Sequence, residues 1–153
     1  MIRAGFYAAI LCILAASATA QTVLTVTHDG ETIEYDMAAL QALPQTEYTT
    51  TNAFIDGSKV FSGPLLRDVL KLSNSFDEKE VMMRAINNYE ITLPVSDSID
   101  YDVIIATQMD GALMSIREKG PLWLMYPFSE FPELDDSVYK GRIIWQLVNI
   151  STK

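Results

Sequence analysis

The most reactive residue types are scarce in this sequence. The chain has one histidine, His28, and one cysteine, Cys12. One residue of each type excludes a zinc site built from the usual Cys and His clusters. It also excludes a Ser-His-Asp or Cys-His catalytic unit unless His28 is the base. His28 has no nucleophile or orienting group nearby in the sequence, so we interpret it as an exposed turn histidine.

The best local candidate for ligand binding is the segment 115–121, with the sequence Ser-Ile-Arg-Glu-Lys-Gly-Pro. It places Arg117 and Lys119 in one loop that ends in a rigid Gly-Pro pair. Because the chain carries a formal net charge of -9, a short basic loop stands out as a candidate anion site. The alternative interpretation is a surface loop whose two cations pair with nearby acidic side chains.

Aromatic and acidic side chains gather in the C-terminal third. The aromatic residues are Trp123, Tyr126, Phe128, Phe131, Tyr139 and Trp145. Such residues normally form core, although some of them can line a ligand cleft. The acidic residues are Glu130, Glu133, Asp135 and Asp136. They lack the Asp-x-Asp-x-Asp-Gly order of a calcium loop, so we expect a solvated face and no metal site.

Length and composition predict one globular domain. The chain has 153 residues, of which 49% are hydrophobic and 20% are charged, with 11 Lys+Arg against 20 Asp+Glu. This balance is too apolar for a disordered chain and too charged for an integral membrane bundle. The negative net charge argues against nucleic acid as a partner, because phosphates require a basic patch. It also argues against tight docking to an anionic lipid surface.

The first twenty residues have the pattern of a secretory signal peptide. Arg3 supplies a positive charge, an apolar stretch follows over 4–16, and Ala18-Thr19-Ala20 provides small residues at a cleavage position. The apolar stretch is shorter than the ~20 residues that span a bilayer, which favours cleavage after Ala20 over an uncleaved anchor. Residues 21–153 are then expected to form a single cysteine-free domain, periplasmic or secreted, without a stable membrane span.

The first half of the chain predicts a hairpin and two short helices. A β-branched strand over 22–28 and a return strand over 31–35 flank Asp29-Gly30, a strong hairpin signal. A helix is expected over 37–43, where Asp36 can cap its start and Pro44 ends it. A second helix is expected to begin at Pro64, capped by Ser62 or Gly63, and to run to Leu72.

The rest of the chain shows short strand patterns, expected over 48–54, 81–86, 89–94, 101–109, 112–114, 122–126 and 142–150. Asp110-Gly111 predicts a second tight hairpin. We expect a polar connection over 97–100 and a loop over 128–140 that holds one helical turn. These elements predict an α+β domain with a mixed or antiparallel sheet and a few short helices.

Five segments in order resemble the oxidoreductase molybdopterin-binding domain of sulfite oxidases. They are Phe61–Leu70 (similar to W-x-G-hydrophobic-x-L-R-D-hydrophobic-L), Ala85–Tyr89 with Leu93-Pro94 (A-x-D-x-Y and hydrophobic-P), Ile104–Met114 (L-L-A-Y-x-M-N-G-x-P-L), Arg117–Leu124 (R-x-H-G-x-P-hydrophobic-R) and Trp145–Ile150 (V-K-W-L-x-x-I-x-V). The resemblance extends over about residues 46–150 and is strongest to small, exported, stand-alone members. It implies a sulfite-oxidase-like fold and, for the family's enzymes, molybdopterin-dependent redox chemistry.

The departures from the family pattern concern the metal and the anion site. In the family, a cysteine thiolate binds molybdenum, and the corresponding stretch here, Tyr48–Phe54, has no cysteine. The family's histidine in the basic loop is replaced by Lys119, and its following arginine falls near Trp123 or Leu124. The resemblance therefore implies ligand-facing roles for Arg117 and Lys119. It also implies cleft or structural roles for Asn87, Tyr89 and Trp123, and it supplies no catalytic residue or metal ligand.

Three hypotheses follow from these patterns. The first is an exported, non-catalytic protein without cofactor that binds a small anionic ligand or a protein partner beside Arg117 and Lys119. The second is a molybdopterin-dependent oxidoreductase, or a subunit of one, in which pterin alone holds the metal or a partner completes the site. The third is an accessory or sensor-input domain that contacts an envelope protein through the acidic and aromatic stretch 128–139.

Overall fold

The fold was analysed in a computed structural model that describes residues 20–152. The predicted signal peptide lies outside the described residues except for Ala20, so its cleavage remains a prediction. Within 20–152, no helix is both long enough and apolar enough to cross a membrane.

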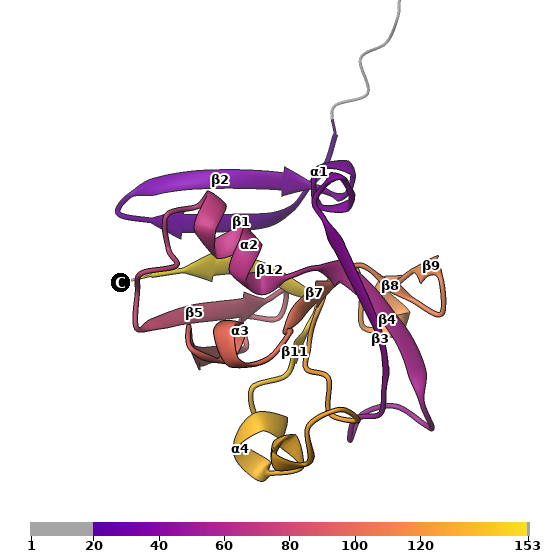
Figure 1. Ribbon diagram of the computed structural model, residues 1–153. Helices are drawn as coiled ribbons and strands as arrows, with labels where there is room; N and C mark the ends of the chain where they lie inside the picture. The colour runs from indigo at the N-terminus through magenta and orange to yellow at the C-terminus, as the bar shows by residue number, and fades with distance from the viewer. Residues whose placement is uncertain (1–19, 153) are drawn as a thin grey trace, which may run out of the picture.

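A five-stranded mixed sheet forms one side of the molecule (Figure 1). Its strands, in spatial order, are β2 (Glu31–Asp36), β1 (Thr22–His28), β12 (Leu147–Ser151), β5 (Glu80–Ala85) and β6 (Glu90–Pro94). Strands β1 and β12 pair in parallel, and the other neighbours pair antiparallel. The first and last strands of the domain are thus adjacent, which confirms the expected mixed sheet.

Two smaller sheets complete the domain. One contains β3 (Gln45–Thr50), β4 (Lys59–Pro64), β8 (Gln108–Met109) and β9 (Ala112–Leu113). The other contains β11 (Ile144–Trp145), β10 (Trp123–Met125) and β7 (Ile104–Ala106). The three-stranded sheet runs through the interior, because all six residues of β7 and β10 are buried.

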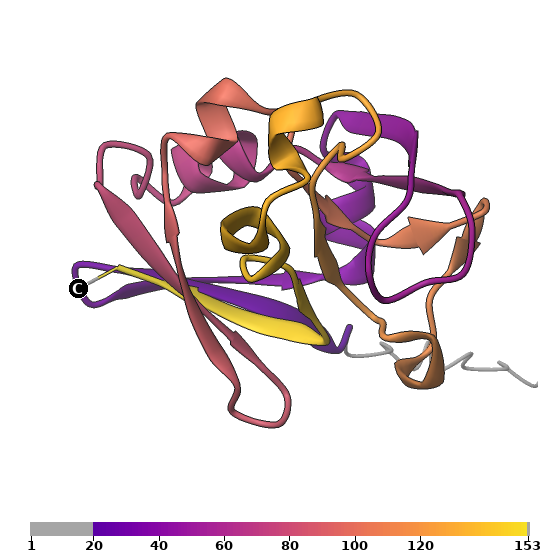
Figure 2. The same ribbon diagram turned by 90° about the horizontal axis from the view of Figure 1, so that it is seen from below.

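The helices are short and lie beside the sheets. They are α1 (Met37–Ala42), α2 (Leu66–Leu72), α3 (Asp97–Asp100) and α4 (Ser137–Lys140), with 3₁₀ turns η1 (Ile116–Glu118) and η2 (Pro132–Leu134). In the view from below, α2 and α3 cover one face of the five-stranded sheet (Figure 2). The apolar side chains Leu66, Val69 and Leu70 of α2 are fully buried in the main core. The α+β architecture is therefore confirmed.

Several local predictions are confirmed in detail. Asp29 and Gly30 both have positive φ (49° and 81°), as a two-residue hairpin turn requires, and they join β1 to β2. Asp36 caps α1, since its Oδ1 accepts a hydrogen bond from the Ala39 amide at 2.7 Å.

Other predictions are corrected by tertiary pairing. Residues 62–64 do not cap α2; they end β4, because Gly63 and Pro64 pair with Thr46 and Gln45. The expected strand over 101–109 is two strands in different sheets, β7 and β8. The expected strand over 142–150 is likewise divided into β11 and β12 at Gln146, which has φ +53°. The connection 97–100 forms the helical turn α3.

Candidate functional site

A cavity of about 320 Å³ opens where the β5–β6 turn, β11, α4 and the loop after β3 converge. The side chains around it are mostly aromatic or aliphatic, and none is acidic. They are Phe54, Ala85, Asn87, Tyr89, Lys140, Gly141, Ile143, Ile144 and Trp145. Its volume lies at the lower end of the roughly 300–1,000 Å³ typical of small-molecule sites, and its mostly apolar lining with a few polar groups is compatible with such a site.

The turn between β5 and β6 positions two of the residues that the resemblance implicates, Asn87 and Tyr89. Asn88 adopts a left-handed conformation (φ 64°), and the Asn87 side-chain oxygen accepts a hydrogen bond from the Tyr89 amide at 3.1 Å. The side-chain NH₂ of Asn87 is thereby left to donate. Tyr89 is 54% exposed at the cavity rim. Both residues lie at the cavity.

Lys119 contacts two of the aromatic rings that line the cavity, Phe54 and Trp145, but it does not line the cavity itself. Its Nζ is 5.7 Å from the ring centre of Phe54, 5.4 Å from that of Trp123 and 5.3 Å from that of Trp145. It also donates a 2.5 Å hydrogen bond to the Phe54 carbonyl oxygen. The expected alternative, pairing of this cation with an acidic side chain, is therefore replaced by contacts with three rings and one carbonyl.

Two hydrogen bonds join the loop that carries Lys119 to Gln146, the residue after β11. Gln146, at the break between β11 and β12, donates from its backbone to Lys119 O at 3.1 Å and from its side chain to Ile116 O at 3.0 Å. At the start of the loop, Ser115 donates to Glu118 from both its amide and its hydroxyl. These hydrogen bonds lower the pKa of the Glu118 carboxyl.

The structure separates the two cations of the basic loop. Arg117 is exposed on η1 and is not among the residues that line the cavity. Trp123 is fully buried behind Trp145, with 6.2 Å between ring centres. Of the five residues singled out from the sequence, Asn87 and Tyr89 line the cavity. Lys119 and Trp123 contact the lining residue Trp145, and Arg117 does not line the cavity.

Lys140 is a polar group at the cavity that sequence reasoning missed. It also borders a second hollow of about 390 Å³, lined by Thr51, Asn52, Ala53, Phe128 and Asp135. Its Nζ donates to Asp135 Oδ1 at 2.5 Å, and this contact lowers the pKa of the Asp135 carboxyl. The sequence contains no signal for Lys140 except its position after the acidic residues. Lys140 reaches the cavity because of where α4 lies in the fold.

The wall formed by residues 141–144 is anchored by a second missed group. Arg142 donates to Asp97 Oδ2 at 2.6 Å, and the Tyr126 hydroxyl donates to the same oxygen at 2.6 Å. Burial, followed by the hydrogen bond to Asp97, raises the pKa of Tyr126 far above its usual value. Because Asp97 and Arg142 are far apart in the sequence, no local pattern could have paired them.

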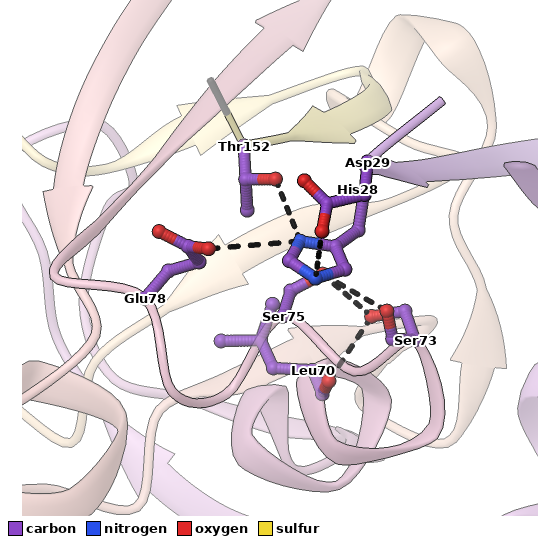
Figure 3. Close-up of polar contacts among 7 residues, drawn as sticks. All are labelled: His28, Asp29, Leu70, Ser73, Ser75, Glu78 and Thr152. Carbon is purple, nitrogen blue, oxygen red and sulfur yellow. Dashed lines mark hydrogen bonds and ion pairs between the residues drawn. The ribbon is translucent and has the colours of Figure 1, made fainter. Parts of the chain in front are cut away.

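His28 is not an exposed turn residue. Only 16% of its side chain is exposed, and its Nδ1 lies 2.8 Å from Thr152 Oγ1 and 3.9 Å from Glu78 Oε1 (Figure 3). The nearby hydroxyls of Ser73 and Ser75 are hydrogen-bonded to each other at 3.0 Å. The hydrogen bond between His28 and Thr152 therefore links the end of β1 to the segment after β12. No group of three or more His, Cys, Asp or Glu residues within 20–152 is arranged to hold a metal ion.

Comparison with known proteins supports the same family as the sequence motifs. The family described as "Oxidoreductase molybdopterin binding domain" matches residues 15–131. This range contains four of the five quoted segments and ends before Trp145–Ile150. A search of curated proteins finds no match.

A solved structure with a similar fold is the sulfane dehydrogenase SoxCD from Paracoccus pantotrophus, with a TM-score of 0.63 and 15% sequence identity. The alignment covers 84% of this chain and 37% of the SoxCD chain, so the likeness concerns the fold of one part of that protein. Because the family match extends over most of the sequence, the chain belongs to the oxidoreductase molybdopterin-binding domain family.

Proposed function

We propose that this chain is an exported, non-redox binding protein that holds a small aromatic anion in the cavity beside Asn87, Tyr89 and Lys140. The observation that carries the proposal is the chemistry of the cavity lining. Phe54, Tyr89 and Trp145 supply aromatic surface, and within residues 20–152 no carboxylate lines the cavity, although the chain has 20 Asp+Glu. Export is inferred from the N-terminal sequence pattern alone.

The polar groups at the cavity favour a ligand that accepts hydrogen bonds. The Asn87 oxygen is engaged by the Tyr89 amide, so the side chain presents its NH₂ group. Lys140 adds an ammonium whose partner Asp135 is 80% exposed. A carboxylate or sulfonate on a flat ring can accept from both donors while the ring contacts the aromatic walls.

The donor set does not fit a molybdenum centre held by a protein thiolate. The only cysteine, Cys12, precedes the described residues. In the stretch that resembles the family's cysteine segment, Thr50 is fully buried, donates to Thr51 O at 3.2 Å and accepts from the Ser129 amide at 3.2 Å. Asn52 turns its NH₂ group toward Met125 Sδ at 3.5 Å. This segment thus offers no soft anionic ligand for molybdenum.

Fluorescence titration with 2-naphthalenesulfonate tests the proposal directly. We expect saturable one-to-one binding that quenches tryptophan emission, and weaker binding of the neutral 2-naphthalenemethanol. Lys140→Met is expected to weaken binding of the sulfonate about fivefold or more and to leave the alcohol unchanged. Lys79→Met, a change of an exposed lysine that does not line this cavity, is the matched control. Equal affinity for both probes, or equal effects of both variants, would refute the assigned site.

Elemental analysis tests the non-redox part of the proposal. The full-length chain, expressed in a host that makes molybdopterin, is expected to be purified without molybdenum and without the fluorescence of oxidised pterin. Near-stoichiometric pterin would instead support the alternative of a molybdopterin-dependent oxidoreductase in which pterin alone holds the metal.

A further inference from the structure

The side chain of Lys119 is surrounded by aromatic rings in the geometry of a cation-binding cage. Three ring centres lie between 5.3 and 5.7 Å from its Nζ, all within the ~6 Å at which a cation is attracted to a ring face. Phe54 and Trp145 pack against each other at 4.9 Å between centres, and Trp145 and Trp123 at 6.2 Å. The Phe54 carbonyl provides one hydrogen-bond acceptor for the cation.

Trp123 packs in the core against Phe61 and Trp145, but its polar ring nitrogen is not satisfied there by any residue within 20–152. Trp123 is fully buried, and its indole Nε1 has no hydrogen-bond partner among the described residues. A buried donor without a partner costs free energy that phenylalanine would not incur. Tryptophan, however, has the ring face that attracts cations most strongly. A role of Trp123 in contacting an ammonium group would therefore account for a buried indole whose N–H has no hydrogen-bond partner in the described part of the chain.

The backbone of Lys119 gives a second indication that its side chain is held for the cage. Lys119 ends η1 in the left-handed conformation with φ +68°, a position that glycine or asparagine adopts at lower cost. The loop before it, residues 115–118, is exposed. Lys119 thus adopts an unfavourable backbone conformation at the end of an exposed loop, while its ammonium lies within 6 Å of three ring centres.

We propose that Phe54, Trp123 and Trp145 form a binding site for a small alkylammonium cation, in which Lys119 is the built-in occupant. An external cation enters when the Lys119 side chain withdraws to solvent. This site is distinct from the anion cavity, although both share the rings of Phe54 and Trp145. The net charge of -9 favours approach of cations to the protein.

The single acceptor in the cage defines the preferred ligand more closely. The Phe54 carbonyl pairs with an N–H group, so ammonium ions that retain an N–H are expected to bind better than quaternary ions. Trimethylammonium carries one N–H, tetramethylammonium carries none, and tert-butanol is a neutral molecule of similar shape with one O–H donor. The expected order of affinity is trimethylammonium, then tetramethylammonium, then tert-butanol.

The variant Lys119→Gly empties the cage and removes the left-handed strain. In the folded full-length variant, trimethylammonium chloride is expected to raise Tm and to change tryptophan emission saturably, binding about tenfold more tightly than tert-butanol. The response should disappear in Lys119→Gly/Trp145→Leu and should not be reproduced by sodium chloride of equal ionic strength. A folded Lys119→Gly variant with no saturable response, or with the same response to tert-butanol, overturns the proposal.

A measurement on the unaltered chain keeps the proposal testable if the variant does not fold. The caged amine of Lys119 is expected to react with an acylating reagent several-fold more slowly than the exposed amine of Lys79, as read by mass spectrometry of peptides. Trimethylammonium chloride should accelerate acylation of Lys119 alone, because it competes for the cage, whereas tert-butanol and sodium chloride should not. Unchanged reactivity of Lys119 at saturating trimethylammonium would overturn the proposal without affecting naphthalenesulfonate binding.

Discussion

Arg142 and Asp97 form a short, largely buried ion pair, with 2.6 Å between Arg142 Nη1 and Asp97 Oδ2. The Asp97 side chain is 7% exposed and the Arg142 side chain 23%. Tyr126 donates to the same carboxylate oxygen, and the Tyr139 ring lies 5.1 Å from the Arg142 guanidinium. The pair thus connects α3 to the segment that forms one wall of the cavity.

Replacing Asp97 with Asn is expected to destabilise the protein substantially. The change leaves the Arg142 guanidinium without its counter-charge in a mostly buried position, which costs about 3 kcal/mol. The urea unfolding midpoint measures the loss. Asp135→Asn is the control, because it breaks an exposed pair with Lys140 and is expected to cost less than about 1 kcal/mol. If the two substitutions lower the free energy of unfolding equally, the buried pair contributes no more to stability than the exposed pair.

Stability is expected to fall in alkaline solution because of Tyr126. Its folded-state pKa is raised above the usual 10.0, so above pH 10 the unfolded chain releases a proton that the folded chain retains. The unfolded state then binds fewer protons, and the free energy of unfolding decreases with pH, by up to roughly 1.4 kcal/mol per pH unit for one such group. Below pH 10 the contribution is fully present.

The variant Tyr126→Phe separates this effect from the other tyrosines. It loses one hydrogen bond to Asp97 at all pH values, but its stability should decline less steeply between pH 10 and 11 than that of the unaltered chain. Urea midpoints at pH 8, 10 and 11 give the two slopes. Tyr35, Tyr48 and Tyr101, whose pKa values are also raised, contribute to the slope that remains. Identical slopes would mean that Tyr126 ionises freely in the folded protein.

Gly63 is predicted to tolerate no side chain. A Cβ at this position would lie 2.0 Å from the backbone oxygen of Ile105, because β4 crosses β7 at close range. Gly63→Ala should therefore cost about 3 kcal/mol or prevent folding. Gly111→Ala provides the comparison, since Gly111 has open space around it and only a positive φ of 78°, which costs about 1 kcal/mol. Thermal unfolding distinguishes the two, and similar Tm values would contradict the crowding at Gly63.

The contact of His28 with Thr152 is expected to contribute measurably to stability. A double-mutant cycle with His28→Ala and Thr152→Val should give a coupling energy of about 1 kcal/mol, because the 2.8 Å hydrogen bond is partly buried. The exposed pair Thr27 and Thr32, with 3.1 Å between hydroxyls, is the reference and should couple weakly. If the coupling energy between His28 and Thr152 is no larger than that of the reference pair, the predicted stabilising contact is refuted.

Much of the fold was predictable where the cause is local. The hairpin at Asp29-Gly30 depends on two residues that accept positive φ, and the start of α1 depends on one capping side chain at Asp36. The ordered motifs likewise indicated the family that the comparison confirms. Each of these signals is contained in a few adjacent residues, so the sequence by itself determined them.

The remaining features required the tertiary structure because they depend on pairings between distant segments. The break at Gln146 divides the last strand between two sheets, and it is stabilised by hydrogen bonds from Gln146 to Lys119 O and Ile116 O. Packing likewise encloses Lys119 in rings from three separate segments and leaves Arg117 outside. The spacing of residues along the chain does not predict which way a side chain points or which distant aromatic rings it will contact. The sequence alone therefore determined the family and the local turns, whereas packing decided that Lys119, and not Arg117, lies among the aromatic rings.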